Sequence, residues 1–129
     1  MLLDTQVWLW MNAAHRRLGP TALNVIYDPQ VDRLLSVASC WEITIKYALG
    51  KLALAAEPRA YFEERLPTTA TELLPITLED VLRTGRLPHV HGDPFDRMLV
   101  AQALVHRIPV ITADRRFAEY GVEVIPVGP

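Results

Sequence analysis

The sequence lacks the features that mark secreted, membrane-spanning and disulfide-stabilised proteins. It holds a single cysteine, Cys40, among 129 residues, so no disulfide can form within the chain. The first ten residues, MLLDTQVWLW, contain no basic residue and reach Asp4 at once, which is unlike a secretory signal. No apolar run is long enough to cross a bilayer. We therefore expect a cytoplasmic protein without a membrane partner.

Positive charge is also scarce. The 13 lysines and arginines are outnumbered by 15 aspartates and glutamates, which gives a formal net charge of −2 at pH 7. This balance argues against a protein that coats nucleic acid through charge alone, but not against a nucleic-acid enzyme that uses metal ions. Hydrophobic residues make up 50% of the chain and charged residues 22%, as in globular domains. We expect one domain over residues 1–129.

Binding motifs built on glycine, histidine or cysteine are missing as well. The chain has no glycine-rich phosphate loop of the Walker or Rossmann type. His89 and His91 stand two residues apart in an expected loop, with no Cys/His cluster elsewhere, so a zinc site is disfavoured. Cys40 has no histidine placed to activate it as a nucleophile. We expect a core or interface position, rather than base stacking, for the three tryptophans: Trp8, Trp10 and Trp41.

What the chain does contain is an alternation of short apolar segments with helical segments. Apolar and β-branched runs predict strands at residues 1–4, 32–39, 72–76, 108–112 and 122–127. Helices are predicted at residues 5–12, 19–28, 39–52, 57–66, 77–87 and 93–107. This alternation predicts an α/β fold, a three-layer α/β/α sandwich with a central parallel sheet.

Residues typical of caps mark the ends of two predicted helices. Ser39 is expected to be the N-cap of the helix at residues 39–52, and Gly50 to end it. Ser39 and Glu42 also have the spacing of a capping box. Asp93 is expected to cap the helix at residues 93–107, with Pro94 at its first position.

Carboxylates from distant segments flank these elements at one edge of the predicted sheet. Asp4 follows the first strand directly, and Asp114 follows the fourth by one residue. Glu42 lies in the first turn of the helix after the second strand, while Asp93 and Asp96 open the helix before the fourth strand. Because ligands bind at the carboxyl ends of parallel strands, we expect these acids to converge there.

Each acid also has a structural explanation. Asp4 and Asp114 can cap a helix or a short turn, and Asp93 fits an N-cap. Glu42 stands four residues before Lys46, a spacing that suits an ion pair, and taken alone it is better explained by structure than by catalysis. The expected convergence favours chemistry, because clustered carboxylates repel one another and need a compensating cation.

Asp96 differs from Asp93 in its place on the helix. The residues three, four and seven positions further on are Leu99, Val100 and Ala103, so Asp96 heads an apolar stripe and is expected to point inward. A carboxylate in that position has no structural purpose, and the helix N-terminus favours its ionised form.

Oxygen ligands of this kind suit hard divalent cations. Mg²⁺ binds carboxylates and keeps several waters, and in enzymes such ions activate water and stabilise leaving oxygens in phosphate chemistry. Carboxylates without a matching Cys/His set therefore predict phosphodiester hydrolysis.

Four segments, taken in order, resemble a known family. They are LLDT with a tryptophan soon after, SVASCWEITIKYALGKL, HGDPFDRMLVAQAL and ITADRRFAEYGVEVI. Together they resemble the PIN-domain ribonucleases, most closely the VapC-like toxins of type II toxin–antitoxin pairs, and the W-E-I-x-I-K and D-P-F-D-R blocks are the most specific. The resemblance implies an α/β/α sandwich and an endoribonuclease that depends on Mg²⁺ or Mn²⁺. It also implies an RNA substrate, a homodimer and a small antitoxin that holds the enzyme inactive.

The resemblance also assigns residues. It places the catalytic and metal-binding acids on Asp4, Glu42, Asp96 and Asp114. Asp93 belongs to the same motif, and Gly92 stands where many relatives carry a basic residue.

Thr112 is expected to steady a ligand by hydrogen bonding. Candidates for phosphate contacts, with a solvated surface charge as the alternative for each, are Lys46, Arg97, Arg115 and Arg116.

Two other functions stay open at this point. A haloacid-dehalogenase-like phosphatase also places an aspartate after its first strand, but it needs a second aspartate two residues later, where this chain has Gln6. A non-catalytic PIN-like domain that binds RNA or a partner would be expected to lose some of the acids, and this chain keeps all four. Metal-dependent cleavage of RNA separates these alternatives.

Overall fold

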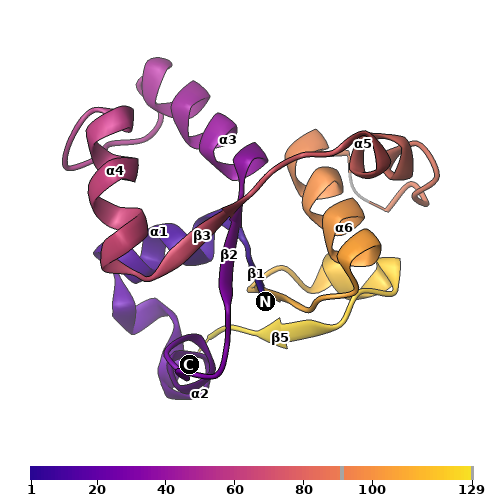
Figure 1. The fold of residues 1–129 in the computed structure, drawn as a ribbon, viewed down its shortest axis with the longest axis horizontal. Coiled ribbons are helices and arrows are strands. Elements are labelled where there is room, and N and C mark those ends of the chain that lie inside the picture. Colours follow the sequence, from indigo (N-terminus) through magenta and orange to yellow (C-terminus); the bar gives the residue numbers. More distant parts are fainter. Residues whose placement is uncertain (91, 129) are drawn as a thin grey trace.

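The computed structural model describes residues 1–90 and 92–128, and its centre is a parallel sheet (Figure 1). The strands pair in the order β3-β2-β1-β4-β5, and every pair is parallel. The bounds of the strands are β1 Leu2–Leu3, β2 Arg33–Ser36, β3 Thr71–Leu74, β4 Val110–Thr112 and β5 Val124–Pro126.

Helices connect the strands and cover the sheet. In Figure 1, α1 to α4 gather on one side of the strands, and α5 and α6 lie on the other. Among the described residues, no helix has both the length and the apolar content needed to span a bilayer. The bounds are α1 Thr5–Ala13, η1 His15–Arg17, α2 Gly19–Ile26, α3 Val37–Ala48, α4 Pro58–Thr68, α5 Leu78–Thr84, α6 Pro94–His106 and η2 Arg115–Tyr120.

Neighbouring residues of each strand point to opposite faces of the sheet and so enter two different cores. Leu3 packs with Trp8 in the core under α1 to α4. Leu2 packs with Leu99 and Phe117 in the core under α6 and η2. Each such side chain, fully buried, contributes about 1.5–3 kcal/mol to folding. These two cores on either side of a parallel sheet confirm the predicted α/β/α sandwich.

Two predicted helix ends are confirmed. The end of α3 falls at Ala48, and Gly50 follows with a positive φ of 71°, a conformation that glycine adopts without strain. The start of α6 falls at Pro94, with Asp93 as N-cap.

The predicted start of α3 is wrong. The strand ends at Ser36 and the helix begins at Val37, so residues 37–39 belong to the helix and not to the strand. Ser36 is the N-cap, and its Oγ accepts a hydrogen bond from the backbone N–H of Ala38 at 3.0 Å. Because the chain passes from strand to helix without a loop, the cap falls on the last strand residue.

The expected capping box of Ser39 and Glu42 does not form for the same reason. Ser39 is buried inside α3, where its Oγ accepts a hydrogen bond from Oγ1 of Thr5 at 2.7 Å. A capping box is found instead at the start of α5, between Thr77 and Asp80.

Candidate active site

The pairing of β1 with β4 brings two distant polar residues together at the carboxyl edge of the sheet. The register places Leu3 opposite Ile111, so Asp4 and Thr112 follow side by side. The Thr112 hydroxyl donates to Oδ2 of Asp4 at 2.7 Å and accepts from the backbone N–H of Asp114 at 2.9 Å. One buried threonine therefore orients the carboxylate of Asp4 and the chain at Asp114.

Asp4 occupies the N-cap position of α1, but its side chain does not cap the helix. Its backbone carbonyl accepts the first helical hydrogen bond from Trp8, while the carboxylate accepts no cap hydrogen bond. Burial raises the pKa of Asp4, the Thr112 hydrogen bond opposes this rise, and the charges of Glu42 and Asp114 add to it. The capping explanation for this carboxylate is therefore wrong.

Glu42 projects from the second turn of α3 and is only 7% exposed. Its Oε2 accepts from Nζ of Lys46 at 2.8 Å, which confirms the predicted i,i+4 ion pair. That hydrogen bond raises the pKa of Lys46, burial opposes the rise, and the charges of Asp93 and Asp96 add to it. The ammonium of Lys46 thus interacts with three carboxylates.

The start of α6 presents two aspartates with different partners. Oδ1 of Asp93 accepts from the backbone N–H of Phe95 at 2.8 Å and from that of Asp96 at 3.5 Å, which confirms the predicted N-cap. Asp96 is half-buried above the fully buried Leu99 and Val100, as its place on the apolar stripe predicts. Burial raises the pKa of Asp96 to about 7, and the nearby charges, Asp93 first, contribute to the rise.

These side chains border one hollow of about 210 Å³, here called the acid hollow. Four carboxylates and a single cation, Lys46, are among its lining residues, which are Asp4, Thr5, Gln6, Leu9, Glu42, Lys46, Asp93 and Asp96. Four acids around one cavity repel one another unless cations compensate them. The acid hollow is therefore suited to a positively charged ligand.

Asp114 stands beside the acid hollow and not in its lining. It is the N-cap of η2, and its carboxylate accepts from the backbone N–H of Arg116 at 2.9 Å and from the guanidinium at 2.8 and 3.1 Å. The capping alternative for Asp114 is thus confirmed. Its charge still raises the pKa of both Asp4 and Asp96, so it adds to the field of the acid hollow.

The acid hollow has the ligand chemistry that a hard divalent cation prefers, because its acidic side chains offer carboxylate oxygens. As placed, however, no three His, Cys, Asp or Glu side chains within residues 1–90 and 92–128 are arranged to hold one ion. Protein donors engage three of the carboxylates separately: Thr112 for Asp4, Lys46 for Glu42 and the first turn of α6 for Asp93. His91 of the disfavoured zinc pair lies outside the described residues.

The predicted phosphate contacts mostly have protein partners. The guanidinium of Arg97 donates to the backbone carbonyls of Thr84 and Pro88 at 2.9 and 3.0 Å, and so links α6 to the end of α5 and to the segment after it. Lys46 and Arg116 donate to Glu42 and to the N-cap of η2, as described above, and Arg115 is exposed. A role in RNA binding stays a prediction for each of the four.

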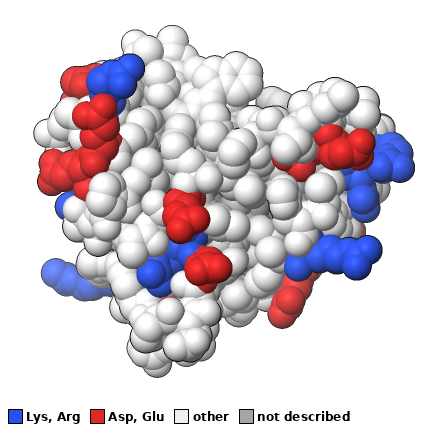
Figure 2. Space-filling view, viewed as in Figure 1, with Lys and Arg blue, Asp and Glu red and all other residues white. Residues whose placement is uncertain are grey.

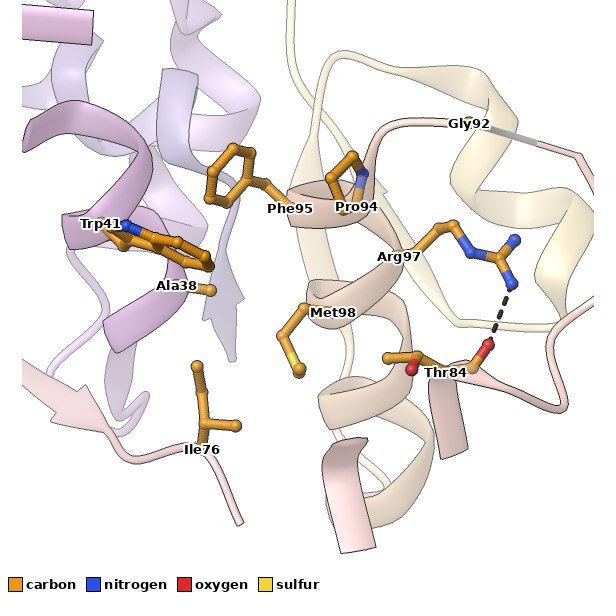
Figure 3. Close-up of a pocket in the computed structure, with 9 residues that line it drawn as sticks. All are labelled: Ala38, Trp41, Ile76, Thr84, Gly92, Pro94, Phe95, Arg97 and Met98. Carbon is orange, nitrogen blue, oxygen red and sulfur yellow. Dashed lines mark hydrogen bonds between the residues drawn. The ribbon is translucent and has the colours of Figure 1, made fainter. Parts of the chain in front are cut away.

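An aromatic groove beside the acid hollow was not predicted. Figure 3 shows Trp41 and Phe95 facing one another, with Ile76 and Met98 below them. The two rings meet edge to face with centroids 5.2 Å apart, and the groove has a volume of about 400 Å³. Trp41 is 61% exposed, so it does not belong to the core. In sequence, each ring directly precedes an acid of the hollow, Glu42 or Asp96.

The fold agrees with comparisons to known proteins. The PIN domain family model matches residues 1–123, and the chain belongs to the PIN-domain family. Among curated relatives, Ribonuclease VapC16 of Mycobacterium tuberculosis is 36% identical over 66 residues. That match covers 48% of this chain and 47% of the relative, so it spans about half the length of each.

Solved structures show the same fold over nearly the whole chain. VapBC2 from Rickettsia felis, bound to a promoter DNA fragment, matches with a TM-score of 0.74 at 12% identity, covering 98% of this chain and 97% of that one. DNA-bound VapBC from Salmonella typhimurium gives 0.70 at 17% identity, with coverages of 97% and 96%. A toxin–antitoxin complex from Klebsiella pneumoniae gives 0.66 at 18% identity, with coverages of 99% and 98%.

Proposed function

We propose that this protein is a VapC-like endoribonuclease that hydrolyses RNA phosphodiester bonds at the acid hollow and depends on Mg²⁺ or Mn²⁺. The observation that carries the proposal is the gathering of Asp4, Glu42 and Asp96 from three separate elements around one small cavity. The similarity to a relative named as a ribonuclease supports the choice of substrate. PIN-domain ribonucleases generally use divalent metals, which matches the all-carboxylate donor set.

The residues expected to hold the cation are Asp4, Glu42, Asp96 and Asp114. When bound, such an ion lowers the pKa of water and neutralises charge that develops on the phosphate. Thr112 keeps Asp4 in one orientation, and the helix N-terminus at Asp93 positions Asp96. Because the pKa of Asp96 is about 7 in the metal-free protein, this carboxyl must release its proton before it binds a cation.

Cleavage of a single-stranded RNA tests the proposal directly. The wild-type protein should cut with Mg²⁺ or Mn²⁺ and stop in excess chelator. Asp96→Asn should lose cleavage, while Glu72→Gln, which changes an exposed acid on β3, should retain it. RNA binding without any cleavage would overturn the enzymatic proposal and favour a non-catalytic PIN-like domain.

We also propose that the protein acts in the cytoplasm as a homodimer and is held inactive by a cognate antitoxin. The solved relatives include a structure described as a toxin–antitoxin complex. Exposed apolar side chains on α3 and α5 support a protein partner, since Trp41, Leu78 and Leu82 are 61%, 72% and 54% exposed. In the view of Figure 2, the surface over α3 is largely uncharged.

Expression in bacteria tests the toxin assignment. The wild-type protein alone should arrest growth, and co-expression of a candidate antitoxin should restore it. Asp96→Asn should be harmless at the same protein level. Equal toxicity of wild type and Asp96→Asn would reject the assignment.

A further inference from the structure

A second hollow, of about 510 Å³, lies at the carboxyl edge of β4 and β5. Its lining residues are Trp10, Arg16, Arg17, Ala113, Val127 and Gly128. We infer that this basic hollow binds the phosphodiester backbone of the single-stranded RNA whose scissile bond lies in the acid hollow. The inference rests on the proposed function and adds to it two cations that the sequence did not single out.

The two hollows share one edge of the sheet, and Thr112 connects them. Its hydroxyl donates to Asp4 of the acid hollow, and its backbone carbonyl accepts from the N–H of Val127 at 3.2 Å in the basic hollow. Ala113, which stands between Thr112 and Asp114 in the sequence, lines the basic hollow. A strand that leaves the acid hollow past Asp114 therefore reaches the basic hollow next.

The basic hollow has the charge that such a strand requires. Arg16 and Arg17 are both exposed, and none of its six lining residues is acidic. The guanidinium carbon of Arg17 lies 5.6 Å from the centroid of the Trp10 ring, a cation–π arrangement that holds the charge in place. Basic side chains combined with an aromatic ring are typical of surfaces that bind single-stranded nucleic acid without sequence preference.

The acid hollow explains why these cations are needed. Its carboxylates repel a phosphate, and the protein as a whole carries a net charge of −2, so neither attracts RNA. An acidic segment of a partner protein could also bind two arginines. The RNA backbone is the better match because the basic hollow continues the edge at which the scissile phosphate is expected.

Binding of a labelled RNA in chelator tests the inference without cleavage. The probe is a fluorescein-labelled single-stranded RNA of about 12 nucleotides and mixed sequence, followed by anisotropy at several salt concentrations. Arg16→Ala/Arg17→Ala should weaken binding at least about tenfold at low salt and reduce the salt slope by about 1.4, since each single-strand phosphate contact contributes about 0.7. The control Arg59→Ala/Arg86→Ala removes two exposed arginines outside the basic hollow and should bind like the wild type.

Cleavage kinetics separate this inference from the proposed function. If the wild type cuts RNA, Arg16→Ala/Arg17→Ala should raise KM and leave kcat nearly unchanged. Unchanged RNA affinity and KM in this variant would overturn the inference while cleavage stands. The inference is equally overturned if the variant loses only the binding of an antitoxin, which would assign the hollow to an acidic protein segment. Loss of RNA binding in a protein that never cleaves would support the basic hollow and reject the enzyme.

Discussion

The Thr112 hydroxyl donates a 2.7 Å hydrogen bond to Oδ2 of Asp4, although the two residues are 108 positions apart in the sequence. The bond is possible because β1 and β4 are neighbours in the sheet and end at the same edge. The same hydroxyl accepts the backbone N–H of Asp114. Thr112 thus links the first and last acids of the candidate site through a single buried oxygen.

Removing that oxygen should impair the site more than the fold. Thr112→Val keeps the β-branched shape but leaves Asp4 without its donor and the N–H of Asp114 without its acceptor. We expect RNA cleavage to fall about 10- to 100-fold and stability by about 1–3 kcal/mol. Thr112→Ser, which keeps a hydroxyl, should retain most of both properties. Cleavage rates and urea denaturation measure the two effects, and full activity in Thr112→Val would contradict this role.

Asp96 should make the stability of the metal-free protein depend on pH. Its pKa rises from 3.8 to about 7 on folding, so the folded state favours the protonated carboxyl. This preference contributes to the free energy of unfolding. The contribution is fully present below the unfolded pKa of 3.8 and is lost as the pH rises through the folded pKa of about 7. Asp96→Asn should therefore match the wild type near pH 4 and exceed it by about 1 kcal/mol near pH 8, after allowance for solvent screening.

Urea denaturation in chelator at both pH values measures this difference. Added Mg²⁺ at the higher pH should stabilise the wild type and not the variant. A variant that is less stable than the wild type near pH 8 without metal would show that Asp96 is not strained by burial and its acidic neighbours.

Asp93 and Asp96 should have different roles, Asp93 as a helix cap and Asp96 as a metal ligand. Asp93→Asn keeps an acceptor for the first turn of α6, so we expect it to retain stability and much of the cleavage activity. Asp93→Ala removes the cap and should cost about 1 kcal/mol of stability. Metal titrations of Asp93→Asn and Asp96→Asn decide the matter. If both lose activity and metal binding to the same extent, Asp93 is a ligand and not only a cap.

Lys46 should compete with a metal ion for Glu42. Its ammonium lies 2.8 Å from Oε2 of Glu42, and Lys46→Met leaves this buried carboxylate without a counter-charge. We expect the metal-free variant to lose about 1 kcal/mol of stability, with the exposure of Lys46 limiting the loss. It should also gain more in melting temperature from Mg²⁺ than the wild type does. Lys51→Met, on an exposed lysine, is the control; an equal gain in both variants would refute the competition.

The sequence predicted the layers and the acids better than it predicted the contacts among them. The alternation of apolar and helical segments predicted the sandwich, and the residue types at Gly50 and Asp93 predicted the helix end and the helix cap there. The misplaced cap of α3 shows the limit of local reasoning. Ser36 and Ser39 are both residues that cap helices well. Ser36 is the cap because α3 begins directly after β2, with no loop between them.

Surface features depend on tertiary packing, and so the sequence did not predict them. Trp41 was expected in a core or an interface, and its exposure rules out the core; its contact with Phe95, a residue 54 positions away along the chain, could not be predicted. The run His15–Arg16–Arg17 is a local basic cluster in a chain of negative net charge, and that signal was available. Its place beside Ala113 was not available, because it depends on how the segment around η1 packs against the ends of β4 and β5.

The ends of the RNA products test the central claim most directly. Attack of water on the phosphorus in the acid hollow, with departure of the 3′-oxygen, leaves a 5′-phosphate and a 3′-hydroxyl, whereas attack by the ribose 2′-hydroxyl expels the 5′-oxygen and leaves a 2′,3′-cyclic phosphate and a 5′-hydroxyl. We predict 5′-phosphate and 3′-hydroxyl ends, formed only with a divalent metal and lost in Asp96→Asn. Cyclic phosphate ends, or cleavage that continues undiminished in chelator, would contradict hydrolysis by the carboxylates of this site.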